Sequence, residues 1–146
     1  MRKLLTIAAF GLGIAISAPL LAAEPKESAT LYKNPQCDCC ENYADYLREN
    51  GFAVDVKPTH DLVVMSRKAG IPDDFQGCHL AFVDGYAVSG HVPIAAVRRL
   101  LDERPDIKGV TLPGMPSGSP GMGGRKSEPF TIYEIGAETP RVYATE

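Results

Sequence analysis

The chain has 146 residues, a formal net charge of −3, four cysteines and no tryptophan. This length suits one domain with a short N-terminal segment, and the acidic balance argues against nucleic acid as a partner and is compatible with a cationic ligand. The only long apolar run lies near the N-terminus and is short for a membrane span, so we expect no span in the mature chain.

Residues 1–23 are predicted to be a secretory signal peptide. Arg2 and Lys3 form a basic start, an apolar run follows, and small residues precede an expected cleavage after Ala23. Residues 24–146 would form the exported domain. Loss of the two basic residues changes the formal net charge from −3 to −5. The segment lacks a twin-arginine pair, which predicts export of the unfolded chain, before any cofactor is inserted.

A strand over residues 29–32 is predicted to lead, through a turn, into a helix that carries three of the four cysteines. The apolar stripe of this helix is Cys40, Tyr43, Ala44 and Leu47. Gly51 stands where a helix C′ residue is expected. Cys37, Cys39 and Cys40 would therefore lie at the helix start. Free backbone N–H groups there favour thiolate, so we expect lowered thiol pKa values.

The later elements complete an α/β pattern. They are a strand over 52–56, a helical segment over 60–69, a hairpin of 80–83 and 86–88, a helix from Pro93, a Gly- and Pro-rich loop over 109–124, and strands at 130–133 and 142–143. The first strand, helix and strand form a right-handed parallel βαβ unit. This order predicts a thioredoxin-like fold with a mixed sheet of about four to five strands and flanking helices. In such a fold, Cys78 faces the other three cysteines.

One hypothesis for the Cys37 and Cys40 pair is thiol–disulfide exchange with other proteins. The C-x-x-C spacing can cycle between dithiol and disulfide. Cys78, however, occupies the position where such oxidoreductases usually carry a cis-proline. A third thiol between the pair would also favour scrambling, so this alternative explains the cysteines less well.

Metal binding explains four converging thiols better. Soft thiolates suit Cu(I), which accepts two or three of them and tolerates bridging, so several copper ions could share ligands. Structural zinc sites usually use two well-separated cysteine pairs, and iron–sulfur clusters are usually acquired before export. A zinc site or a disulfide-stapled scaffold remains a third alternative.

Histidines and methionines supply further candidate ligands. His79 follows the fourth cysteine, and His91 lies just before the helix that Pro93 begins, at the same predicted end of the fold. Met115 and Met122 lie in the glycine-rich loop, and thioethers suit Cu(I). Their alternatives are structural hydrogen bonding for the histidines and covering of apolar surface for the methionines. The candidate metal ligands are Cys37, Cys39, Cys40, Cys78, His79, His91, Met115 and Met122.

Five ordered motifs make the chain resemble the CopG-type periplasmic copper-resistance family, formerly known as a domain of unknown function. They are YKNPQCDCC at 32–40, GCH at 77–79, GY at 85–86, GHVP at 90–93 and PGMPSGSPGM at 113–122. The resemblance implies a thioredoxin-like fold, a periplasmic location and copper handling through the four cysteines. It implies copper ions and other periplasmic copper-handling proteins as partners, and assigns the methionine loop no function.

Overall fold

The computed structural model describes residues 27–146, so the predicted signal peptide lies outside the described residues. The described elements are β1 (Ser28–Lys33), α1 (Asp38–Glu49), β2 (Ala53–Pro58), α2 (Leu62–Lys68), the 3₁₀ turn η1 (Asp73–Phe75), β3 (His79–Val83), β4 (Tyr86–Ser89), α3 (Ile94–Glu103), β5 (Gly109–Thr111), β6 (Thr131–Ile135) and β7 (Val142–Thr145). None of the helices in this part of the chain is long and apolar enough to cross a membrane.

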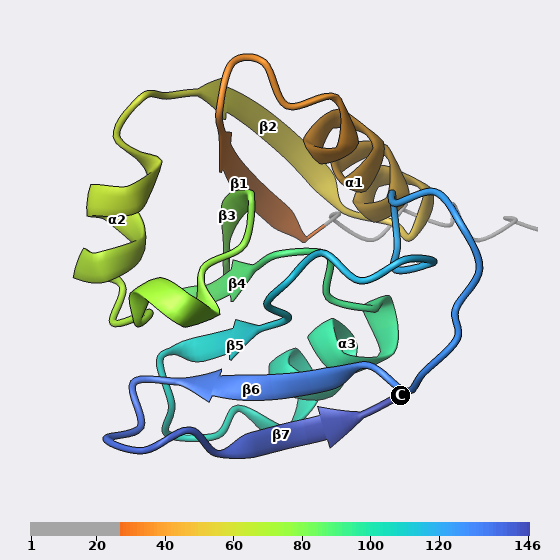
Figure 1. Ribbon diagram of the computed structural model, residues 1–146. Helices are drawn as coiled ribbons and strands as arrows, with labels where there is room; N and C mark the ends of the chain where they lie inside the picture. Colours follow the sequence, from red (N-terminus) through yellow and green to blue (C-terminus); the bar gives the residue numbers. More distant parts are fainter. Residues whose placement is uncertain (1–26) are drawn as a thin grey trace, which may run out of the picture.

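The strands form one mixed sheet in the order β2-β1-β3-β4-β5-β6-β7 (Figure 1). β1 pairs with β2, and β4 with β5, in parallel, whereas the other neighbours are antiparallel. The α/β class and the mixed sheet are confirmed. The sheet has seven strands, more than the four to five predicted, because β5, β6 and β7 extend it beyond β4. β3 runs antiparallel to both of its neighbours, β1 and β4. β3 therefore begins beside the end of β1.

Local sequence signals account for the elements around the cysteines. The predicted stripe of α1 is buried, and the helix ends at Glu49, just before Gly51. Asp84 and Gly85 both have positive φ and join β3 to β4 in the predicted hairpin. Pro93 directly precedes α3, as predicted.

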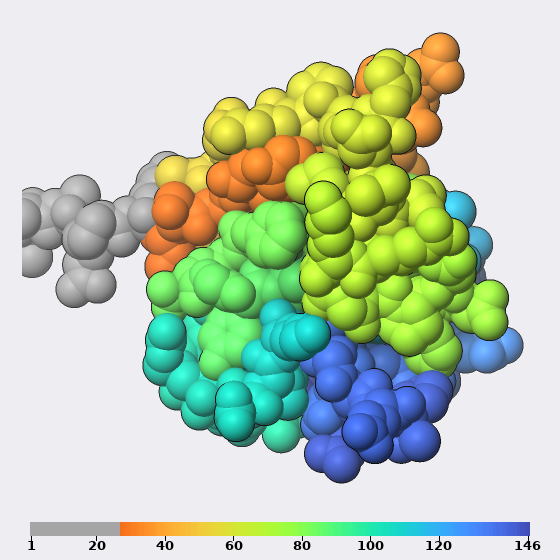
Figure 2. All heavy atoms as spheres, turned by 90° about the vertical axis from the view of Figure 1, so that its left-hand side faces the viewer, coloured from red at the N-terminus to blue at the C-terminus, as the bar shows by residue number. Residues whose placement is uncertain are grey.

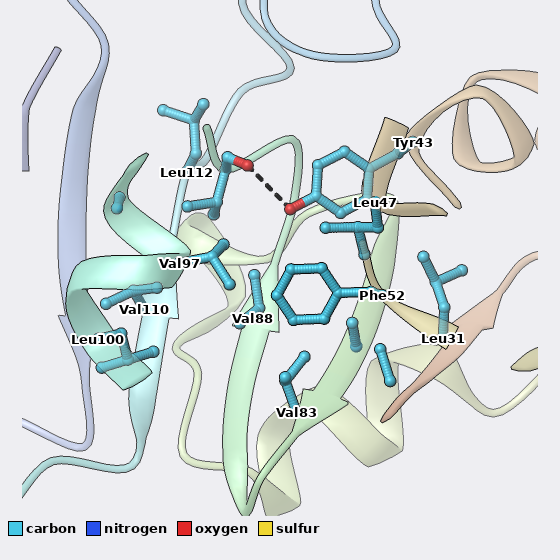
Figure 3. Close-up of a cluster of buried hydrophobic side chains, with 14 of the residues drawn as sticks. Leu31, Tyr43, Leu47, Phe52, Val83, Val88, Val97, Leu100, Val110 and Leu112 are labelled. Carbon is cyan, nitrogen blue, oxygen red and sulfur yellow. Dashed lines mark hydrogen bonds between the residues drawn. The ribbon is translucent and has the colours of Figure 1, made fainter. Parts of the chain in front are cut away.

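Helices cover both faces of the sheet. α1 and α3 bury their apolar stripes against one face, and α2 and η1 pack on the other, where their atoms form a block at the surface (Figure 2). The core under α1 and α3 is drawn in Figure 3, with Leu31, Tyr43, Leu47, Phe52, Val83, Val88, Val97, Leu100, Val110 and Leu112 labelled. This core fixes α1, and with it the cysteines, against the centre of the sheet.

The stretch predicted as a loop from residue 109 begins instead with β5. Gly109 lies so close to β4 that a Cβ there would stand 1.8 Å from the carbonyl oxygen of Ala87. Only glycine allows this approach. Gly109, which contributed to the prediction of a loop, is therefore the residue that lets β5 pair with β4. The rest of the loop then runs past α1 before it reaches β6 (Figure 1).

Candidate metal centre

The turn after β1 places three cysteines at the start of α1. Cys37 is the N-cap residue, and Cys39 and Cys40 lie in the first turn. Cys37 and Cys40 are joined in a disulfide, whereas Cys39 and Cys78 are free thiols. In this state Cys37 and Cys40 do not titrate, so the effect of the helix start on their thiols stays a prediction.

The fourth cysteine faces the other three, as the topology predicted. The Sγ of Cys78 lies 3.5 Å from the Sγ of Cys40 and 3.8 Å from the Sγ of Cys39. The Sγ atoms of Cys37 and Cys39 are 3.4 Å apart. All four sulfurs lie within 4.8 Å of one another. With a metal–sulfur bond of about 2.3 Å, as for zinc, two sulfurs on one ion are at most about 4.6 Å apart. The four cysteines are thus close enough to hold a metal ion once the Cys37–Cys40 disulfide is reduced and its two sulfurs separate.

Two buried histidines extend the group beyond the sulfurs. The Nε2 of His91 lies 3.2 Å from the Sγ of Cys78, and the Nδ1 of His79 lies 3.5 Å from the same sulfur. These three side chains form a second group of potential ligands that shares Cys78 with the first. The Nε2 of His79 is buried without a hydrogen-bond partner among the described residues.

A main-chain carbonyl sets the orientation of one imidazole. The Nδ1 of His91 is 2.6 Å from the oxygen of Pro120. Since a carbonyl oxygen only accepts, Nδ1 is the donor. In the neutral ring, Nε2 then carries a lone pair directed at Cys78.

Burial keeps these groups neutral in the metal-free protein. It raises the pKa of the Cys78 thiol to about 12, with the charge of Cys39 as a second cause. Burial also lowers the pKa of His79 to about 3, and it lowers the pKa of His91 as well. A soft cation that binds Cys78 would have to displace the thiol proton. At His79 and His91 it would meet uncharged imidazole rings.

Tyr43 packs the histidines into place. Its ring stacks on His79 at 4.5 Å between centroids and meets the edge of His91 at 5.5 Å. Its hydroxyl donates to the carbonyl oxygen of Val92 at 2.9 Å (Figure 3). Sequence reasoning placed Tyr43 in the apolar stripe of α1 and missed this contact with the site.

Lys33 is a second residue whose place at the site was missed. It is 4% exposed, and its Nζ donates to the carbonyl oxygen of Cys37 at 3.1 Å and contacts Glu41 Oε1 at 3.1 Å. The strand period held a signal, because Ala29, Leu31 and Lys33 alternate on the buried face of β1. A lysine at such a position marks a buried cation.

The predicted methionine ligands lie in the long loop. Met115 is exposed, and Met122 is half-buried and follows Gly121, which packs against α1. Their role as ligands stays a prediction. His60, the third histidine of the chain, is exposed.

Comparison with known proteins points to one family. Residues 75–122 match the model described as "Protein of unknown function, DUF411". A solved structure titled "Copper resistance protein copG- Form 2" is 31% identical and has a TM-score of 0.76, with 84% of this chain and 99% of that chain covered. "Copper resistance protein copG- Form 1" is also 31% identical, with a TM-score of 0.75 and coverage of 84% and 98%. No curated protein sequence matches the chain.

Proposed function

Because the chain belongs to the CopG-type copper-resistance family, we propose that it is a periplasmic copper-binding protein that holds Cu(I) through its clustered cysteines. One observation carries the proposal: four sulfur atoms lie within 4.8 Å of one another at the start of α1. Thiolates are the soft ligands that Cu(I) prefers. Zinc is less well supported, because three of the ligands come from one turn.

The ligand set supports more than one copper ion. The Sγ of Cys78 belongs both to the four-sulfur group and to the group with His79 and His91. A thiolate can bridge two Cu(I) ions, so this sulfur would link them. His79 and His91 would supply nitrogen ligands beside the sulfur of Cys78.

The disulfide couples copper binding to oxidation state. Cys37 and Cys40 offer thiolates only after the S–S bond accepts two electrons. In the reverse direction, two Cu(II) ions take one electron each from the two thiolates, giving two Cu(I) ions and the disulfide. In the opposite step, two Cu(I) ions would give one electron each to the disulfide and return two Cu(II) ions and two thiolates, so the site would interconvert the two copper oxidation states.

An anaerobic titration with Cu(I) against a chromophoric chelator tests the proposal. Reduced protein should bind Cu(I) tightly, and oxidised protein should bind much less because two of its four sulfurs are unavailable. Reduction should restore binding. The doubly substituted variant Cys37→Ser/Cys40→Ser should resemble the oxidised protein in both redox states. Binding equal to that of the wild type would remove these thiols from the mechanism.

Thiol–disulfide exchange with other proteins is the second candidate, and the disulfide at the start of α1 favours it. Against it, Cys78 lies 3.5 Å from Cys40, where an exchange enzyme needs room to dock a partner chain. Reduction of insulin by metal-free protein separates the two functions. Turnover without copper would support exchange.

The proposed location rests on the predicted signal peptide and on the family. Copper would reach the site from, or leave it for, other periplasmic copper-handling proteins. N-terminal sequencing of protein from a periplasmic fraction should begin at Glu24. Recovery of the intact N-terminus from the cytoplasmic fraction would contradict export.

A further inference from the structure

We propose that the segment Ser119–Gly121, which we call the His91 strap, is a positioning element that fixes the imidazole of His91 in the tautomer whose Nε2 lone pair faces Cys78. Its consequence for copper rests on the proposed function. The tautomer itself is a property of the metal-free protein, so the two ideas can fail separately.

The contacts of His91 leave one tautomer favoured. The side chain is fully buried, so water does not compete for its nitrogens. Nδ1 lies 2.6 Å from the carbonyl oxygen of Pro120, and Nε2 lies 3.2 Å from the Sγ of Cys78. In the opposite tautomer, the Nδ1 lone pair would face the Pro120 oxygen, and a buried hydrogen bond would be lost. Such a loss leaves the buried carbonyl oxygen of Pro120 without its hydrogen-bond donor, which disfavours that tautomer.

Two hydrogen bonds hold the strap: one within the loop, and one to α1, the helix whose start carries three of the cysteines. The Oγ of Ser119, which is 1% exposed, donates to the carbonyl oxygen of Pro116 at 2.7 Å. Asn42 Nδ2, on α1, donates to the carbonyl oxygen of Gly121 at 3.3 Å. The loop accordingly passes beside α1 in Figure 1. Helix, strap and histidine therefore form one connected unit.

Gly121 is the residue that allows this close packing. Its φ is +79°, and a Cβ there would lie 2.7 Å from the backbone nitrogen of Tyr43. An added methyl group must push the strap away from α1, and with it the Pro120 carbonyl away from His91. This gives the Gly- and Pro-rich loop a role that does not depend on its methionines.

The loop also provides a matched control. Gly114 has nearly the same φ, +80°, but a Cβ there meets nothing within 4 Å. Gly114→Ala and Gly121→Ala thus impose the same backbone strain and differ in whether the strap is displaced. The first readout is the pair of ¹⁵N chemical shifts of the His91 ring in metal-free protein, which distinguishes the two tautomers. The second is the Cu(I) affinity of the reduced protein.

We expect the Nδ1–H tautomer in the wild type and in Gly114→Ala, and a mixture of tautomers in Gly121→Ala. Loss of a hydrogen-bond partner behind a metal-bound histidine typically lowers affinity by about 10–100-fold, so Gly121→Ala should fall in that range and Gly114→Ala should stay near wild type. An Nε2–H tautomer in the wild type overturns the proposal. This measurement needs no variant, so it decides the matter even if Gly121→Ala does not fold. Equal losses in both variants also overturn it. The expected tautomers in a wild type that binds no Cu(I) would refute the proposed function and leave the strap intact.

Discussion

Lys33 and His79 are paired residues on β1 and β3, at the end of the sheet where the cysteines gather. Both side chains are buried, but one is a cation held by carbonyl oxygens and Glu41, and the other is a neutral ring stacked on Tyr43. A buried ammonium stabilises negative charge nearby, whereas a buried imidazole with a lowered pKa resists acquiring charge. These two residues therefore govern different properties of the site.

Substitution of Lys33 by Met should make the Cys37–Cys40 disulfide harder to reduce. The ammonium contacts the main chain of Cys37, so its removal destabilises the thiolates formed on reduction. We expect the reduction potential to fall by about 30 mV, equivalent to about 1.4 kcal/mol. Equilibration with dithiol redox buffers measures it. Lys57→Met removes a half-exposed lysine from the neighbouring strand and should leave the potential unchanged. An unaltered potential in Lys33→Met would show that the cation does not act on the disulfide.

The metal-free protein should lose stability as the pH falls. The pKa of His79 is lowered to about 3 in the folded protein, so the unfolded chain binds a proton below about pH 6.5 that the folded chain does not. His91 acts in the same direction. The free energy of unfolding should therefore decrease from about pH 7 towards pH 3, as measured by urea titrations. His79→Gln should flatten this slope, whereas His60→Gln, at an exposed position, should not. A slope unchanged in His79→Gln would contradict the assignment.

At the scale of elements, α1, the β3–β4 hairpin and α3 were predictable because each has a local signal. Each signal determines the secondary structure of the residues next to it in sequence. The signals are the apolar stripe from Cys40 to Leu47, the Asp84-Gly85 turn and Pro93. β5 was not predictable, since three residues form a strand only through pairing with β4 and β6. The ring stack of Tyr43 on His79 was hidden for a similar reason: periodicity shows that a side chain is buried, and not what it contacts.

Tyr43 links α1 to the segment before α3, and its loss should weaken that contact. Tyr43→Phe leaves the buried carbonyl oxygen of Val92 without its 2.9 Å hydrogen bond. We expect a decrease of about 1–3 kcal/mol in the free energy of unfolding, measured by urea denaturation. Tyr32→Phe, at a half-buried position on β1, is the control and should change it by less than about 0.5 kcal/mol. Equal stability of Tyr43→Phe and wild type would show that the bond contributes nothing.

At the scale of the whole molecule, one antiparallel pairing assembles the site. β1 ends where β3 begins, which brings Cys78 to the cysteine turn across 38 residues of chain. This convergence followed from the predicted topology, so the sulfur cluster could be anticipated from sequence. The hydrogen bond between His91 and Pro120 could not be anticipated, because it depends on the path of a loop with no regular secondary structure.

The most direct test of the shared sulfur pocket is an anaerobic Cu(I) titration of fully reduced Cys78→Ser beside reduced wild type. Cys78 is the only one of the four cysteines from outside the α1 turn, and its sulfur joins the cysteine group to the histidine group. We predict fewer bound Cu(I) ions per chain in the variant, and an affinity lower by at least about tenfold, or about 1.4 kcal/mol. The same stoichiometry and affinity in the two proteins would contradict a pocket built from all four sulfurs.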